Sequence, residues 1–236
     1  MNNLGHVFKM LDKKGNFLEV DFRKEKPKDV DKYTNLGGWT YHEVFESKDY
    51  ETEKCFVQKG DVVVDAGANL GFFTVYAALK EASKIYSFEP DAKNFECLKQ
   101  NAPPQAKLFN LGLMAWDGEF PFYVDVNPGG HSFFNYGETK TGEIRKIRCL
   151  SIPSLFEKEG LDKIDFLKMD IEGPEIEILG LLPREYFPKI RNIVFEYHNM
   201  SMRKNSREIV VQRLSRWYNG IVKNRGYLSM LYFWPR

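Results

Sequence analysis

The chain has 236 residues, of which 43% are hydrophobic and 15% aromatic, so it can bury a substantial core and is not a disordered chain. Its 34 Lys and Arg residues nearly balance 33 Asp and Glu residues, which excludes a general electrostatic attraction to nucleic acid. The three cysteines are isolated and follow neither a metal-binding spacing nor a disulfide framework.

The same features indicate where the protein works. The first ten residues lack the apolar core of a signal peptide, and no stretch approaches membrane-spanning length. Isolated cysteines fit a reducing compartment. We therefore expect a cytoplasmic protein without a membrane span. No pattern indicates an oligomeric state.

The N-terminal region is predicted to be an appendage, residues 1–42, to a main domain, residues 43–236. Residues 6–11 and 17–22 alternate apolar and polar side chains around a glycine-containing loop, which predicts a β-hairpin. The trio Gly37-Gly38-Trp39 suits either a surface loop with a docking tryptophan or a flap over a cofactor. A helix is predicted from Glu43 to Phe56.

The most informative stretch begins with Val62, Val63 and Val64, which suit a strand buried on both faces. Small residues follow, in the order Asp65-Ala66-Gly67-Ala68-Asn69-Leu70-Gly71, and allow a sharp turn and a close backbone approach to a ligand. A helix then starts at Phe72, and its exposed N–H groups favour oxygen-rich ligands. The pattern predicts a nucleotide-type site. A turn that uses glycine only to reverse the chain is the alternative.

The next strand, residues 85–88, ends at Glu89, which lies 18 residues after Gly71. An acidic side chain there can accept both hydroxyls of a ribose. The spacing Gly67-x-Asn69-x-Gly71 differs from the G-x-G-x-x-G of dinucleotide sites and resembles the turn of S-adenosylmethionine (SAM) dependent methyltransferases. A nicotinamide-dependent oxidoreductase is therefore disfavoured.

The middle of the chain continues the alternation of helices and strands. A helix over residues 91–100 precedes a strand over residues 107–111, where the amide of Asn110 either reads an adenine edge or belongs to a turn. Strands over residues 120–126 and 144–149 enclose an aromatic loop that holds His131. A short helix is predicted over residues 151–159.

A second informative stretch places acidic groups at two strand ends. The apolar strand that starts at Ile164 delivers Asp170 to its carboxyl end, and Glu172 follows in the turn. Another strand, residues 192–195, is followed by Glu196 and His198. These side chains are predicted to face one cleft. Residues 201–225 are basic and partly helical in spacing, and residues 227–234 form a last strand.

With these stretches in view, the chain resembles the FkbM family of SAM-dependent methyltransferases over roughly residues 43–200. The resemblance rests on Gly60 to Phe73, Ser87 to Pro90, Asp165 to Glu175, and Phe195 to His198. It implies an α/β, Rossmann-like class I fold, with a mainly parallel seven-stranded sheet and helices on both faces. It also implies cofactor roles for Asp65, Gly67, Asn69, Gly71 and Glu89. Where the family often has Ser-Ser, this chain has His131-Ser132.

The resemblance further implies an O-methyltransferase that acts on a hydroxyl of a sugar, glycan or other small polyhydroxylated acceptor. A base must take the hydroxyl proton, and His198, which titrates near neutral pH, is the first candidate, with His131 second. Asp170 and Glu196 are further catalytic candidates, or they could hold a divalent metal, to which no residues are committed.

Two other functions stay open. An RNA 2′-O-methyltransferase would use Lys168, Asp170 and Glu196 together with the basic C-terminal segment, although nucleic acid is not the expected partner. A non-catalytic module that merely binds SAM is the other.

Overall fold

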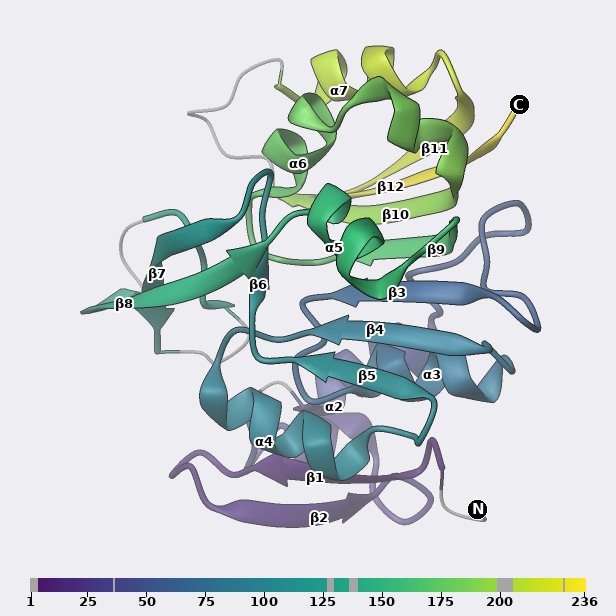
Figure 1. Ribbon diagram of the computed structural model, residues 1–236. Coiled ribbons are helices and arrows are strands. Elements are labelled where there is room, and N and C mark those ends of the chain that lie inside the picture. Colours follow the sequence, from purple (N-terminus) through teal and green to yellow (C-terminus); the bar gives the residue numbers. More distant parts are fainter. Residues whose placement is uncertain (1–3, 36, 127–129, 136–139, 199–205, 227) are drawn as a thin grey trace.

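The computed structural model describes residues 4–35, 37–126, 130–135, 140–198, 206–226 and 228–236 (Figure 1). Among these residues, no helix combines the length and the apolar character needed to cross a membrane.

The centre of the molecule is a seven-stranded sheet in the order β11-β12-β10-β9-β3-β4-β5. The five strands from β10 to β5 run parallel, whereas β12 is antiparallel to both of its neighbours. The mainly parallel seven-stranded sheet expected from the sequence is thus confirmed. Its strands are β3 (Val62–Ala66), β4 (Lys84–Phe88), β5 (Ala106–Phe109), β9 (Ile164–Met169), β10 (Ile190–His198), β11 (Tyr218–Arg225) and β12 (Leu228–Pro235).

Two hydrophobic layers cover the sheet because its central strands are apolar on both faces. Val63 packs into one layer and Val64 into the other, and both are 0% exposed. Helices α3 (Phe72–Leu79) and α4 (Ala92–Asn101) contribute to the first layer. Helices α5 (Ile152–Glu159), α6 (Glu175–Leu181) and α7 (Ser206–Leu214) build the second, with a 3₁₀ segment η3 (Arg184–Lys189). This burial on both faces explains the uninterrupted valine run.

The N-terminal hairpin, β1 (Val7–Leu11) with β2 (Phe17–Asp21), confirms the sequence expectation. It lies beside α4, as Figure 1 shows at the purple end of the chain. The amide of Asn101 fastens it there, since it accepts from Lys9 N at 2.7 Å and donates to the carbonyls of Lys9 and Leu70 at 2.8 and 2.6 Å. The hairpin is therefore tied to the turn after β3.

A small second sheet, in the order β6-β8-β7, stands outside the main one. It consists of β6 (Gly112–Leu113), β7 (Gly118–Asp125) and β8 (Lys140–Leu150). Met114, Phe122, Phe133 and Cys149 form its own apolar cluster. The residues between β7 and β8 include the predicted aromatic loop, of which residues 130–135 are described.

The structure corrects three secondary-structure expectations. Gly37–Tyr41 is a helix, α2, rather than a loop, and it runs directly into a π-helical segment, η1 (His42–Glu46). The helix predicted for residues 43–56 accordingly ends at Glu46. In the basic segment, helix ends at Leu214 and β11 follows, because the polar residues after Trp217 pair with β12 at the sheet edge. A short helix, α1 (Pro27–Val30), lies between β2 and α2. The division at residue 42 falls inside the continuous stretch of α2 and η1 and stays a prediction.

Candidate functional site

The turn after β3 is shaped by three residues with positive φ, namely Gly67 (+75°), Asn69 (+50°) and Gly71 (+95°). At Gly67 a Cβ atom would lie 1.8 Å from the carbonyl oxygen of Asp170. Glycine is therefore required at this position both for its φ and for the close approach of β9. The predicted tight turn is therefore present, and it packs against Asp170, which follows β9.

A cavity of about 270 Å³ opens at the carboxyl ends of the parallel strands. Gly67, Asn69 and Glu89 lie at the ends of β3 and β4 and line one part of it, which we call the donor end. Asp170, Glu172, Glu196 and His198 come from the ends of β9 and β10 and line another part, the acceptor end. Strand ends in an open α/β sheet commonly build ligand sites of this kind.

Glu89 is a buried carboxyl, 5% exposed, at the end of β4. Its Oε2 accepts from Asn69 N and its Oε1 from Asp91 N, both at 2.8 Å. Burial raises the pKa of Glu89 to about 8. The side chain of Asn94 also hydrogen-bonds to Glu89. A carboxylate has about four lone-pair sites, so about one site is left for a further hydroxyl donor. These contacts fix Glu89 to the glycine turn and leave it able to accept from a ribose.

Asp65 contacts protein groups instead of lining the cavity. Its Oδ2 accepts from Thr74 Oγ1 at 2.7 Å, and its Oδ1 lies 3.1 Å from Lys168 Nζ. The same ammonium donates to the carbonyl of Gly67 at 2.8 Å and lies 5.2 Å from the ring centre of Tyr50. Asp65 thus holds the turn through Lys168, and any influence on a cofactor is indirect. Gly71, also absent from the lining, shapes the turn.

His198 lies at the acceptor end between two carboxylates. Its Nε2 is 3.1 Å from Glu196 Oε1, and its Nδ1 is 3.5 Å from Glu172 Oε2. Burial alone would lower the pKa of His198, but these two carboxylates outweigh burial and raise it to about 10. The two neighbours therefore favour the charged imidazole, while burial raises the pKa of Glu172 itself to about 8. His198 is also the last residue of β10 instead of following its end.

Asp170 is fixed by a residue that the sequence did not single out. Tyr50 donates its phenolic hydrogen to Asp170 Oδ2 at 2.6 Å, across 120 positions of sequence. Within the described part of the chain, no hydrogen bond to Oδ1 is found. The sequence predicted a helix across Tyr50, whereas the helical segment ends at Glu46, and this pattern gave no signal that places the phenol in the cavity. Trp39 and Glu43, from α2 and η1, line the same cavity.

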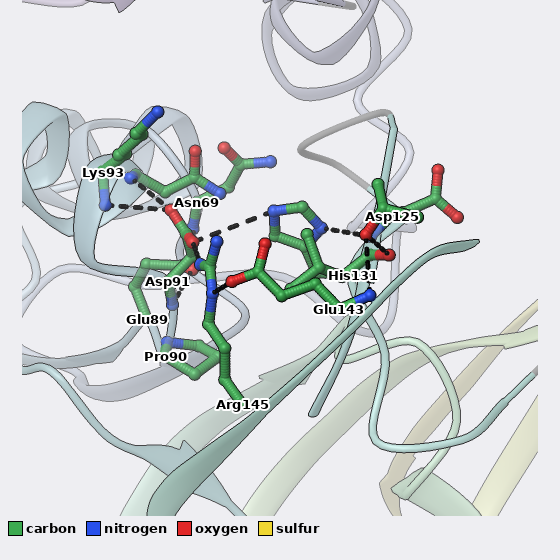
Figure 2. A network of polar contacts seen from close by, with 12 residues as sticks. Asn69, Glu89, Pro90, Asp91, Lys93, Asp125, His131, Glu143 and Arg145 are labelled. Carbon is green, nitrogen blue, oxygen red and sulfur yellow. Dashed lines mark hydrogen bonds and ion pairs between the residues drawn. The ribbon is translucent and has the colours of Figure 1, made fainter. Parts of the chain in front are cut away.

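His131 lies nearer the donor end, within the network drawn in Figure 2. Its Nδ1 accepts from the backbone N–H of Asp125 at 3.0 Å, and its Nε2 is 3.8 Å from Asp91 Oδ2. Asp91 caps α4 and also accepts from Arg145 at 2.7 Å. The loop therefore places His131 against the residues that follow Glu89, while it still lines the cavity.

Asn110 stands apart from the other predicted residues. Its amide donates to the carbonyls of Glu89 and Pro90 at 2.9 and 3.2 Å, and it is absent from the cavity lining. These bonds support the turn that carries Glu89, so the adenine role stays a prediction. No cluster of three or more His, Cys, Asp or Glu side chains in the described ranges is arranged to hold a metal ion.

A family model and several known methyltransferases match this chain. A family model described as the methyltransferase FkbM domain matches residues 65–227. The chain is 28% identical to methyltransferase sdnD of Sordaria araneosa over 66% of this chain and 73% of that protein. It is 26% identical to the 31-O-demethyl-FK506 methyltransferase FkbM of Streptomyces tacrolimicus, over 68% of this chain and 74% of the relative.

Two other matches are more limited. A hexuronic acid methyltransferase, AglP of Haloferax volcanii, is 26% identical over 52% of this chain and 50% of its own length. The crystal structure of a methyltransferase FkbM from Methylobacillus flagellatus KT superposes with a TM-score of 0.55 and 15% identity, covering 82% of this chain. The chain spans about half of that protein, 48%, and the likeness shows the fold alone.

Proposed function

This chain belongs to the FkbM family of methyltransferases, and we propose that it moves the methyl group of SAM to a hydroxyl of a sugar, glycan or similar polyhydroxylated acceptor. The proposal rests on one observation, the opening of a glycine turn and a set of carboxyl groups into the same cavity. Relatives named for a macrolide hydroxyl and for a hexuronic acid support a hydroxylated acceptor.

The donor end would hold SAM, which supplies a methyl group activated by a positively charged sulfur. Glu89 would accept from the ribose through the lone pair that Asn69 N, Asp91 N and the Asn94 side chain leave available. The backbone of Gly67 and Asn69 would approach the rest of the donor closely, since glycine at 67 leaves no side chain in the way.

The acceptor end would orient the hydroxyl and take its proton. Orientation contributes roughly 7–11 kcal/mol to such a displacement, whereas a positioned base contributes a ~10²–10⁴-fold acceleration. His198 is already protonated at neutral pH because its pKa is raised to about 10 by its carboxylate neighbours. We therefore assign proton acceptance to Asp170, held by Tyr50, and assign to His198 the charge balance of Glu172 and Glu196.

An RNA acceptor receives less support. Lys168 directs its ammonium to Asp65 and to the carbonyls of Ala66 and Gly67, away from a role in proton transfer. In the basic C-terminal segment, Arg213 donates to the carbonyl of Leu182, and Arg225 pairs with Asp49. The positive charges of Arg213 and Arg225 are thus paired with groups of the chain itself.

Methyl transfer from radiolabelled SAM to a panel of methyl glycosides and macrolide alcohols tests the proposal. We expect label in at least one hydroxylated product, and Asp170→Asn should slow transfer at least about 100-fold with unchanged affinity for S-adenosylhomocysteine. Asp162→Asn, at the opposite end of β9, is the matched control. If the wild type binds S-adenosylhomocysteine but labels no hydroxylated compound, the acceptor class is wrong.

A further inference from the structure

The Gly37-Gly38-Trp39 trio forms the first turn of α2, and its two glycines serve close packing. A Cβ atom at Gly37 would lie 1.7 Å from Met10 Cε, and one at Gly38 would lie 1.9 Å from the carbonyl oxygen of Pro27. Gly38 N also donates to Asp31 Oδ1 at 2.8 Å. The helix is therefore pressed against β1 and α1, and its position relative to the cavity is fixed.

Trp39, the next residue, lines the cavity and is 55% exposed. Its indole N–H hydrogen-bonds to Glu43, one helical turn later, which also lines the cavity. The ring is thus held at one edge while much of its surface stays open. A large aromatic surface at the wall of a cavity is a typical anchor for a ligand, and its electron-rich face favours the C–H groups of a partner.

The groups around this indole accept hydrogen bonds more readily than they supply positive charge. Burial and the neighbouring carboxylates Asp170 and Glu196 raise the pKa of Glu43 to about 8. The two cations at the acceptor end are both engaged, Lys168 with Asp65 and the turn carbonyls, and His198 with Glu172 and Glu196. Among the residues that the structure describes, a carboxylate on the acceptor would therefore meet carboxyl groups without a further cation to pair with, at a cost in desolvation.

We propose that Trp39 is the platform on which the acceptor stacks, and that the acceptor is an uncharged sugar ring rather than a uronic acid. The ring would place its C–H face on the indole and its hydroxyls towards Glu43, Asp170 and Glu196. This inference rests on the proposed function and narrows its substrate class. It sets this chain apart from the relative whose name specifies a hexuronic acid. Trp39 lies before residues 65–227, so the selecting surface stands outside the matched domain.

Saturation-transfer NMR on the full chain tests the inference, with S-adenosylhomocysteine present to fill the donor end. The probes are the methyl pyranosides of glucose, galactose and mannose, compared with methyl glucuronide. The variants are Trp39→Ala and Trp39→Phe. Trp116→Ala is the matched control because Trp116 is 54% exposed and lies outside the cavity lining.

We expect saturation of the ring C–H protons of at least one neutral sugar, with at least tenfold weaker binding in Trp39→Ala, partial binding in Trp39→Phe and full binding in Trp116→Ala. Methyl glucuronide should bind at least tenfold more weakly than the matching glucoside. Equal binding of the two, or unchanged binding in Trp39→Ala, would overturn the inference. So would the failure of every neutral sugar to bind while S-adenosylhomocysteine binds.

Titration with S-adenosylhomocysteine separates this inference from the proposed function. Trp39→Ala should keep the wild-type affinity for it, and a tenfold loss would assign Trp39 to the donor end and overturn the inference. If neutral sugars stack on Trp39 but no methyl transfer occurs to any hydroxyl, the proposed reaction fails while the stacking surface stands.

Discussion

Lys168 Nζ lies 3.1 Å from Asp65 Oδ1, and both side chains are almost fully buried, with 3% and 0% exposure. The pair connects the end of β3 to β9, since Lys168 also donates to the carbonyl of Gly67. Burial alone would lower the pKa of Lys168, but the charges of Asp65 and Asp170 raise it. The charged lysine therefore stabilises the glycine turn after β3.

The first prediction concerns this ion pair. Lys168→Met should lower the free energy of unfolding by about 3–5 kcal/mol, because it leaves the buried Asp65 carboxylate without its counter-ion. Urea denaturation at pH 7 measures the loss. Lys163→Met is the control, since Lys163 pairs with Asp165 from the surface with 64% exposure of its side chain. Its loss should stay below about 1 kcal/mol. Equal losses in both variants would contradict the structural role of Lys168.

The second prediction concerns Glu89. Glu89→Ala should weaken the binding of S-adenosylhomocysteine roughly 5- to 150-fold, which corresponds to about 1–3 kcal/mol for a buried ribose hydroxyl left without its acceptor. Isothermal titration calorimetry measures the affinity. Glu96→Ala, on the exposed face of α4, should bind like the wild type. Unchanged affinity in Glu89→Ala would contradict the assignment of Glu89 to the ribose hydroxyls.

The sheet and the glycine turn after β3 could be predicted from the sequence because both depend on local chemistry. Three β-branched residues followed by Gly67 and Gly71 specify a doubly buried strand and a left-handed turn without reference to distant residues. Asp91 and Ser151 are helix caps whose side chains accept from N–H groups two or three positions on. Such short-range rules fix where an element begins.

The sequence singled out Trp39 as part of a loop or a flap, but it did not predict that Glu43 and Tyr50 form a cavity wall with it, because that wall depends on packing across long separations. Gly37 and Gly38 allow α2 to pack closely against Met10 and Pro27. No periodic pattern in the sequence predicts this contact. The charge of His198 was missed for a similar reason. Glu196 lies two positions before His198 on β10, but Glu172 comes from the turn after β9, and only the distances in space show that both contact the imidazole and raise its pKa.

The third prediction follows from that pKa. His198→Gln should lower the free energy of unfolding by about 1.5–3 kcal/mol at pH 6, since it removes a charged hydrogen-bond partner of Glu196. Because the pKa is raised from 6.5 to about 10, the histidine's contribution is complete below pH 6.5 and is lost as the pH rises through 10. Unfolding curves at pH 6 and pH 10 should therefore show a shrinking difference. A difference that grows towards pH 10 would show that the imidazole is neutral in the folded protein.

The last prediction concerns Glu43, where a raised pKa again lowers the stability of the folded protein as the pH rises. The pKa of this carboxyl rises from 4.5 to about 8, chiefly by burial, so the folded state holds a proton that the unfolded chain releases. The wild type therefore loses stability relative to Glu43→Gln as the pH rises from 4.5 to 8, by up to about 1.4 kcal/mol per pH unit. Glutamine retains an oxygen that can accept from the Trp39 indole. We expect similar stability of the two proteins at pH 5 and an advantage of up to about 4 kcal/mol for Glu43→Gln at pH 8, measured by urea denaturation. Glu53→Gln, at an exposed position, should show no such pH dependence. An equal difference at both pH values would mean that Glu43 is ionised throughout, and the acceptor end would then carry one more negative charge than the inference about Trp39 assumes.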